Sequence, residues 1–168
     1  MFYQANLTST LMSIPWFHEL DMPRLERLAK ISDLCEVDPN VDIFQEGERE
    51  DYLYVVIEGQ VAIEIFVPGH GRMRIYTAEP LDIFGWSSLT PVVRQRTATA
   101  RALTETRLLS IESESLRRLC DEDEHIGYLI MRRISNIVAS RLLTTRLTLM
   151  DLLANPGFQK DHLKSYSE

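Results

Sequence analysis

A glycine, two serines and an arginine lie close together in one stretch where they could bind a phosphate group. The stretch spans residues 84–102. Gly85 allows the backbone to turn tightly and to approach a ligand closely. Ser87 and Ser88 suit the start of a short helical turn, because their hydroxyls can cap free backbone N–H groups, and such groups attract anions. Arg96 supplies a planar guanidinium that matches two phosphate oxygens. The residue types and their spacing therefore predict a site for one phosphate group.

Short β-prone segments separated by turn residues must position this stretch. They cover residues 34–37, 41–44, 52–57, 61–67, 73–77, 83–84, 97–103 and 107–111. Gly59 marks a tight hairpin between two of these segments. In an earlier turn, Asn40 stands where a left-handed backbone is expected, which Asn tolerates. Many short strands with regular turns predict a double-sheet roll or sandwich.

The first part of the chain predicts a loose segment followed by a short helix. Residues 1–11 are polar and are expected to be loose. Asp21 can cap a helix, and Pro23 suits its first turn. The apolar residues that recur at helical spacing after them are Leu25, Leu28 and Ile31.

After the last β-prone segment, the apolar spacing changes to that of helices. Residues 115–120 predict a short helix, and Asp123 can cap a long one that runs to about Leu153. Its apolar residues at helical spacing are Ile126, Leu129, Ile130, Ile134, Ile137, Val138, Leu142 and Leu147. A helix of about 30 residues is about 45 Å long, which exceeds what a small domain needs. Pairing with another surface is one way to bury its apolar stripe, and folding back onto the strands is the other.

Composition limits the possible classes of function. The chain has 168 residues with 45% hydrophobic and 26% charged residues, which suits one soluble domain. Its net charge of −7 provides no basic field that would recruit nucleic acid. Cys35 and Cys120 lie far apart and are expected to be reduced, partly buried thiols. Neither a membrane helix nor a signal peptide is predicted, so we expect a cytoplasmic protein without a membrane partner.

The sequence does not predict an enzyme. A β-roll can hold a catalytic metal, but that requires clustered His and carboxylate ligands. Here the four histidines are scattered, with no His-x-His pair; they are His18, His70, His125 and His162. A nucleophile elbow and a Walker-type loop are also absent from the sequence. We therefore predict no catalytic residues and no metal site.

The phosphate-binding stretch resembles the cassette of a known family. That family is the cyclic-nucleotide-binding domain of catabolite-activator and Fnr regulators, also found in cyclic-nucleotide-dependent kinases and channels. Its cassette reads Phe-Gly-Glu, a short helix, then Arg-Ser/Thr/Ala-Ala, and here Phe84-Gly85 and Arg96-Thr97-Ala98 match it. Trp86 stands where the family has the Glu that bonds the ribose 2′-hydroxyl. Residues 43–48 and 53–61 give a second close match to the family core.

The resemblance implies a fold and a division of the chain. The fold is mainly β with flanking helices: a double-stranded β-helix, or jelly roll, of eight strands with an N-terminal helix, in residues 1–122. Residues 123–155 would form the long C-terminal helix, which the family uses as a dimer seam. Residues 156–168 would be a polar tail, too short for a helix-turn-helix, so no direct DNA binding is expected.

The resemblance also implies the roles of individual residues. Those expected to bind the ligand phosphate are Gly85, Trp86, Ser87, Ser88, Arg96 and Thr97, and those expected to contact the base are Thr144 and Thr145. The ligand would be cAMP or cGMP, with no other cofactor. For Arg96 the alternative is a salt bridge to one of the chain's own carboxylates. For the two threonines the alternative is an ordinary place on a helix surface.

These expectations combine into one function and one alternative. The chain is predicted to be a stand-alone cyclic-nucleotide-binding-like regulatory domain that forms a homodimer through its long helix. It would bind a small phosphate-bearing ligand and pass its state to an unknown protein partner. The alternative is a degenerate domain of the same fold that binds no ligand and serves as a dimerising scaffold.

Overall fold

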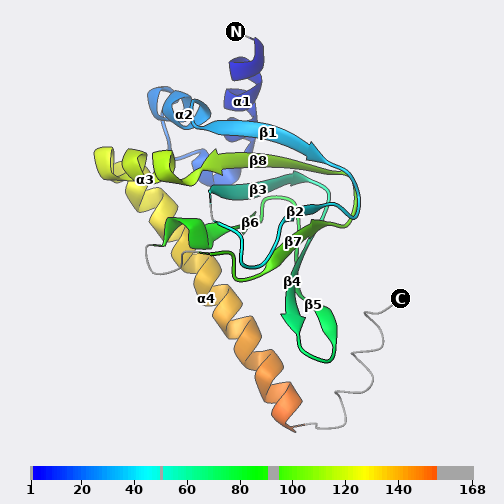
Figure 1. Cartoon of the computed structure of the whole chain (residues 1–168). Coiled ribbons are helices and arrows are strands. Elements are labelled where there is room, and N and C mark those ends of the chain that lie inside the picture. The colour runs from blue at the N-terminus through cyan, green and yellow to red at the C-terminus, as the bar shows by residue number, and fades with distance from the viewer. Residues whose placement is uncertain (1, 50, 91–94, 155–168) are drawn as a thin grey trace. The chain divides into compact units, whose positions relative to one another are not determined.

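The computed structural model describes residues 2–49, 51–90 and 95–154 (Figure 1). The chain divides into two compact units, Met1–Ile130 and Met131–Glu168, and each is treated by itself. The predicted polar tail at 156–168 lies outside the described residues.

The first unit contains two antiparallel sheets of four strands each. The strands are β1 (Ser32–Val37), β2 (Asp42–Phe44), β3 (Tyr52–Glu58), β4 (Val61–Val67), β5 (Gly71–Ala78), β6 (Ile83–Phe84), β7 (Thr99–Ala102) and β8 (Thr106–Glu112). One sheet has the order β1-β8-β3-β6 and the other β2-β7-β4-β5. In Figure 1 the first sheet lies directly beneath α1 and α2. This arrangement confirms the predicted jelly roll with N-terminal helices and a long C-terminal helix.

The core of the roll lies where the alternating side chains of both sheets meet. Its fully buried members include Val56 of β3, Val61 of β4 and Leu108 of β8. Phe84, the last residue of β6, packs in the same cluster at 3% exposure. Since Gly85 follows directly, the start of the predicted phosphate-binding stretch is anchored in the core.

The expectation that residues 1–11 are loose is wrong for the part that the structure describes. Phe2–Ser13 forms helix α1, which packs against α2 (Met22–Ala29) and β1. Leu7 and Leu11 lie one turn apart on α1, Ile14 follows the end of the helix, and each is at most 2% exposed. Burial of these side chains against the rest of the unit holds the helix in place.

Capping residues set the starts of α2 and α4 as the sequence predicts. The Asp21 carboxylate accepts a hydrogen bond from the Arg24 amide at 3.1 Å. The Asp123 carboxylate accepts from the amides of His125 and Ile126 at 3.1 and 3.2 Å. Helix α3 spans Ser113–Glu122, and α4 spans the 31 residues Glu124–Ala154 without a break. At 1.5 Å per residue, α4 is about 46 Å long.

Two residues other than glycine adopt the left-handed backbone among those described. Asn40 has φ +66°, which confirms its expected place in the turn before β2. Leu81 has φ +73°, in the turn that leads into β6. An L-residue that is neither Asn nor Asp is strained in this conformation.

Candidate functional site

Gly85 begins the cassette in a left-handed conformation that strains most other residues. Its φ is +71°, and it precedes a single 3-10 turn, η2 (Trp86–Leu89). A Cβ atom placed on Gly85 would lie 2.6 Å from Nη1 of Arg96 and 3.0 Å from the carbonyl oxygen of Tyr52. The backbone therefore approaches Arg96 as closely as a glycine permits.

Arg96 reaches this glycine from the other end of the cassette. Its side chain is buried, with the residue 4% exposed. Nη1 donates to the carbonyl oxygen of Gly85 at 3.2 Å, and Nη2 donates to that of Tyr52 at 2.8 Å. The structure thus brings together Gly85 and Arg96, the two residues on which the sequence-based prediction depends most.

The backbone of Arg96 is fixed by the turn between β2 and β3. Its amide donates to the carbonyl oxygen of Glu48 at 2.8 Å, and its carbonyl oxygen accepts from the amide of Gly47 at 2.9 Å. A bridge between Arg49 and Gln95 extends this pairing by one residue. The second segment that matches the family therefore holds the arginine in place.

An aromatic cluster surrounds the guanidinium, and the sequence analysis missed it. Cζ of Arg96 lies 4.1 Å from the ring centroid of Phe44 and 5.9 Å from that of Tyr54. The Tyr54 ring stacks on Phe84, with centroids 5.1 Å apart. Such cation–π contacts stabilise a buried cation by about 1–2 kcal/mol. The alternation of Tyr52 and Tyr54 in one strand was the available signal, because it places both on one face.

Burial and the nearby positive charge shift the pKa of the Tyr54 hydroxyl in opposite directions. Burial raises the pKa of its hydroxyl above the ordinary value, whereas the nearby Arg96 guanidinium lowers it. Burial has the larger effect, so the pKa of the Tyr54 hydroxyl is raised above its ordinary value.

The two serines of the cassette are buried but are not caps. The N-cap position of η2 belongs to Gly85, and no side chain caps this turn. The Ser88 hydroxyl accepts from the Ser113 hydroxyl at 2.6 Å, and its carbonyl oxygen accepts from Nη1 of Arg117 at 2.8 Å. Ser88 therefore connects the cassette to the first turns of α3. Ser87 is 7% exposed.

The remaining predicted site residues lie in several places. Trp86 is half-buried and Thr97 is exposed. Thr144 and Thr145 are exposed on α4 in the second unit, and the Thr144 hydroxyl donates to the carbonyl oxygen of Ser140 at 3.1 Å. Their role as base contacts stays a prediction. Residues 91–94, in the middle of the cassette, lie outside the described part of the chain.

Arg101, in strand β7, forms an ion pair with a buried carboxylate. Its Nη2 lies 2.7 and 2.6 Å from the two carboxylate oxygens of Glu64, a residue that is 5% exposed. This hydrogen bond raises the pKa of the Arg101 guanidinium. The pair joins β7 to β4.

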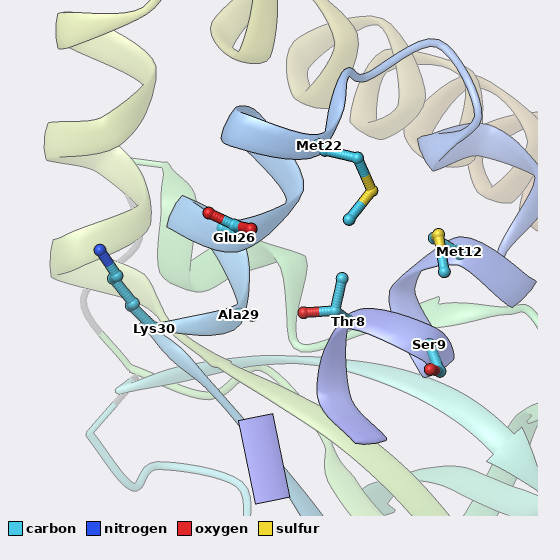
Figure 2. Close-up of a pocket in the computed structure, with 7 residues that line it drawn as sticks. All are labelled: Thr8, Ser9, Met12, Met22, Glu26, Ala29 and Lys30. Carbon is cyan, nitrogen blue, oxygen red and sulfur yellow. The ribbon is translucent and has the colours of Figure 1, made fainter. Parts of the chain in front are cut away.

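A separate pocket lies between α1 and α2, with a volume of about 410 Å³ (Figure 2). Figure 2 shows Met22 directed from α2 toward Thr8 of α1, with Met12 on the far side. Glu26 and Lys30 supply the charged part of its lining. The pocket shares no residue with the cassette, so it adds nothing to the predicted phosphate site.

The described residues offer neither a metal site nor a membrane-spanning helix. His, Cys, Asp and Glu side chains form no group of three or more that could hold a metal ion there. In the same part of the chain, each helix is too short or too polar to cross a lipid bilayer.

Comparison with known proteins assigns the family. Residues 34–123 match the cyclic nucleotide-binding domain, and this segment is more than half of the chain. It includes Gly47, Gly85 and Arg96, whose contacts form the site described above. The chain therefore belongs to the cyclic nucleotide-binding domain family.

Individual relatives agree with this assignment. The chain is 34% identical over 112 residues to a CRP-like cAMP-activated global transcriptional regulator of Mycobacterium tuberculosis; the match covers 66% of this chain and 47% of that protein. It thus spans about half the length of the relative. A putative cyclic nucleotide-binding protein from Geobacter metallireducens superimposes with a TM-score of 0.68 at 27% identity, covering 80% of this chain and 97% of that one. The catabolite activator protein of Thermus thermophilus superimposes with a TM-score of 0.67 at 26% identity. That match covers 83% of this chain and 63% of that one.

Proposed function

We propose that this chain is a cytoplasmic regulatory domain that binds a phosphate-bearing ligand at its cassette, with cAMP or cGMP the first candidates. The observation that carries this proposal is the buried Arg96 guanidinium, held beneath Gly85 by carbonyl oxygens. The family assignment supports it, as does a relative whose name describes it as cAMP-activated. In this proposal the domain has no catalytic role and no metal.

Binding would exchange one set of Arg96 partners for another. A phosphate would replace neutral carbonyl acceptors by charged oxygens that can match the planar guanidinium in a bidentate pair. A charge-assisted bond contributes about 1.5–3 kcal/mol. The carbonyl oxygens of Gly85 and Tyr52 hold the guanidinium until the phosphate replaces one or both of them. Gly85 and Ser87 would complete the lining on the side of η2.

Trp86 would weaken the binding of a ribose. The family's Glu accepts a hydrogen bond from the 2′-hydroxyl, and an indole offers no acceptor there. A hydroxyl left without a partner costs about 1–3 kcal/mol, which is up to roughly 100-fold in affinity. We therefore expect weak cyclic-nucleotide binding, or stronger binding of a phosphate ligand that does not present this hydroxyl.

A second candidate function is a ligand-free dimerising scaffold. The observation in its favour is that both terminal nitrogens of Arg96 already donate to the protein's own backbone. In that case Arg96 only stabilises the contact between β3 and the cassette, and Trp86 marks the loss of the ligand site.

Both candidates include pairing of two copies through α4. The part of α4 in the second unit exposes large apolar side chains, each more than half accessible: Leu142, Leu143, Leu147, Leu149 and Met150. Exposed apolar residues at this density indicate a surface for a partner. In the sensor proposal, ligand binding favours one state of the cassette and α4, and a protein partner responds to that state.

Titration calorimetry with cAMP and with cGMP tests the proposal. The wild type should bind at least one of them, and Arg96→Ala should remove that binding. Arg96→Lys keeps the charge but loses the planar fork, so it should bind more weakly than the wild type. Circular dichroism must show that both variants are folded.

A melting assay provides an independent measurement of binding. A ligand at 100 times its dissociation constant stabilises the folded state by about 2.7 kcal/mol. If neither nucleotide releases heat nor shifts the melting temperature, and Arg96→Ala changes only stability, the scaffold function replaces the sensor function.

A further inference from the structure

The pocket between α1 and α2 has an apolar end and a charged end. Figure 2 shows the two methionines of its lining on one side and the two charged residues on the other; they are Met12 and Met22, and Glu26 and Lys30. Met22, Glu26 and Lys30 follow one another at intervals of four residues, which places them along one side of α2 and its C-terminal cap. Ala29, only 4% exposed, adds no more than a methyl group to the lining.

Both helices that form the pocket are held by contacts on their other sides. On α2, Nε of Arg24 donates to the Asp123 carboxylate at 2.9 Å, and Nη1 of Arg27 donates to it at 3.3 Å. On α1, Leu7 and Leu11 are 2% and 0% exposed. The pocket is therefore preformed, and a ligand need not separate the helices. Its volume of about 410 Å³ lies within the range of small-molecule sites, about 300–1,000 Å³.

The two charges in the pocket are available to a ligand. Glu26 precedes Lys30 by four residues, the spacing at which such side chains often pair on a helix. Among the residues that the structure describes, however, neither of them takes part in an ion pair, and both are exposed. Glu26 would repel a ligand that carries only negative charge, and Lys30 would repel one that carries only positive charge. A zwitterion, in contrast, can pair with both side chains.

The two methionines favour a ligand with a large apolar side chain. Met12 is 43% exposed and Met22 is 48% exposed, so a ligand that lies on them removes apolar surface from water. The unbranched thioether of methionine adapts to the shape of its neighbour and contacts aromatic rings favourably. An α-amino acid carries an ammonium group, a carboxylate and an apolar side chain on one carbon atom. It therefore presents two opposite charges to one end of the pocket and an apolar group to the other.

We propose that this pocket binds a free α-amino acid with a large apolar side chain. The ammonium group of the ligand pairs with Glu26, its carboxylate pairs with Lys30, and its side chain lies between Met12 and Met22. The site is independent of the proposed function, because it shares no residue with the cassette and its ligand carries no phosphate.

NMR of the methionine methyl groups tests the site directly. The chain has six methionines, and the signals of Met12 and Met22 are assigned with the variants Met12→Leu and Met22→Leu. Titration of the full chain with L-phenylalanine, L-leucine or L-tryptophan should shift these two signals, whereas the signal of Met73 in β5 should stay in place. Glycine has the same two charges without the apolar side chain, so it should bind at least about tenfold more weakly.

Matched changes in the ligand and in the protein test the two ion pairs. N-acetyl-L-phenylalanine lacks the ammonium charge, and L-phenylalanine amide lacks the carboxylate. Glu26→Gln should weaken the binding of L-phenylalanine by up to roughly fivefold, the effect of one partly exposed ion pair, but should not weaken that of the N-acetyl derivative. Lys30→Gln should weaken the binding of L-phenylalanine by a similar factor, but not that of the amide. Circular dichroism should show that both variants are folded, because both positions are exposed.

Three results would overturn the proposal. The first is that none of the three apolar amino acids shifts the signals of Met12 and Met22. The second is that L-phenylalanine and its two derivatives have equal dissociation constants for the wild type. The third is that dilution of the protein alone shifts these signals, which would show that a second copy covers the pocket. Calorimetry with cAMP and cGMP on Glu26→Gln and Lys30→Gln should match that of the wild type, so this proposal and the proposed function fail independently.

Discussion

Replacing Gly85 by Ala perturbs the contact between the cassette and Arg96 more specifically than any other single change. The new Cβ would lie 2.6 Å from Nη1 of Arg96, a separation that real Cβ atoms do not show. The Tyr52 carbonyl oxygen would lie 3.0 Å from the same Cβ, which is also closer than an ordinary contact. The guanidinium must therefore leave its place, and its bond to the Gly85 carbonyl oxygen breaks.

The expected decrease in the free energy of unfolding of Gly85→Ala has two components. The left-handed conformation, with φ +71°, costs an L-residue about 1–2 kcal/mol, of which reduced freedom in the unfolded chain returns about 0.4–1 kcal/mol. Displacing the buried guanidinium costs about a further 1.5–3 kcal/mol, the contribution of a hydrogen bond that involves a charged group. Gly47→Ala is the matched control, because Gly47 has φ +87° but no atom within 4 Å of the added Cβ.

Urea unfolding at pH 7 measures both variants against the wild type. The free energy of unfolding of Gly85→Ala should be about 1.5–3 kcal/mol lower than that of Gly47→Ala. This difference corresponds to a melting temperature roughly 3–12 °C lower for Gly85→Ala. Equal losses for the two variants would show that Arg96 is not held tightly beneath Gly85, and the described geometry of the site would be refuted.

Three further changes test other parts of the fold. Leu81→Gly should leave the free energy of unfolding unchanged or raise it by up to about 1 kcal/mol in thermal melts, because relief from φ +73° offsets the added freedom of the unfolded chain. In urea unfolding, Asp123→Asn should destabilise the protein at pH 7, and by less as the pH is lowered below about 4. Burial alone would raise the pKa of the Asp123 carboxyl, but hydrogen bonds from the Ile126 amide and from Arg24 outweigh it and hold the pKa below the usual 3.8. A pKa lowered by folding gives stability above about pH 4 that is lost as the pH falls through the folded value. Burial raises the pKa of the Cys120 thiol to about 11 from 9, so its alkylation at pH 7.5 should be about 100-fold slower in the folded than in the urea-unfolded protein.

The sequence predicted the strands well because their signals are local. Asn40 and the glycine turns mark the ends of strands whose apolar residues alternate, and all of these strands appear in the structure. Helix α1 was missed because its large apolar residues after the first turn are few: Leu7, Leu11 and Met12. Its stability depends on burial against α2 and β1, which no window of local sequence contains.

The site was predicted only in its outline. Gly85 and Arg96 could be paired through the motif, but the partners of the guanidinium come from β3 and from the end of β2. Ser88 was assigned to the ligand from its residue type, whereas the structure gives its hydroxyl a partner in α3. Such contacts depend on how distant strands pack, so residue spacing does not reveal them.

Restoring the family's acidic residue tests the central claim most directly. Trp86 is half-buried, so Trp86→Glu can be made without opening the core. Calorimetry with cAMP should then show an affinity higher than that of the wild type, by up to about 100-fold, because the ribose hydroxyl regains its acceptor. Adding Arg96→Ala to this variant should abolish the binding. An affinity that Trp86→Glu leaves unchanged, or binding by Trp86→Glu that survives the loss of Arg96, would contradict the assignment of this cassette as the ligand site.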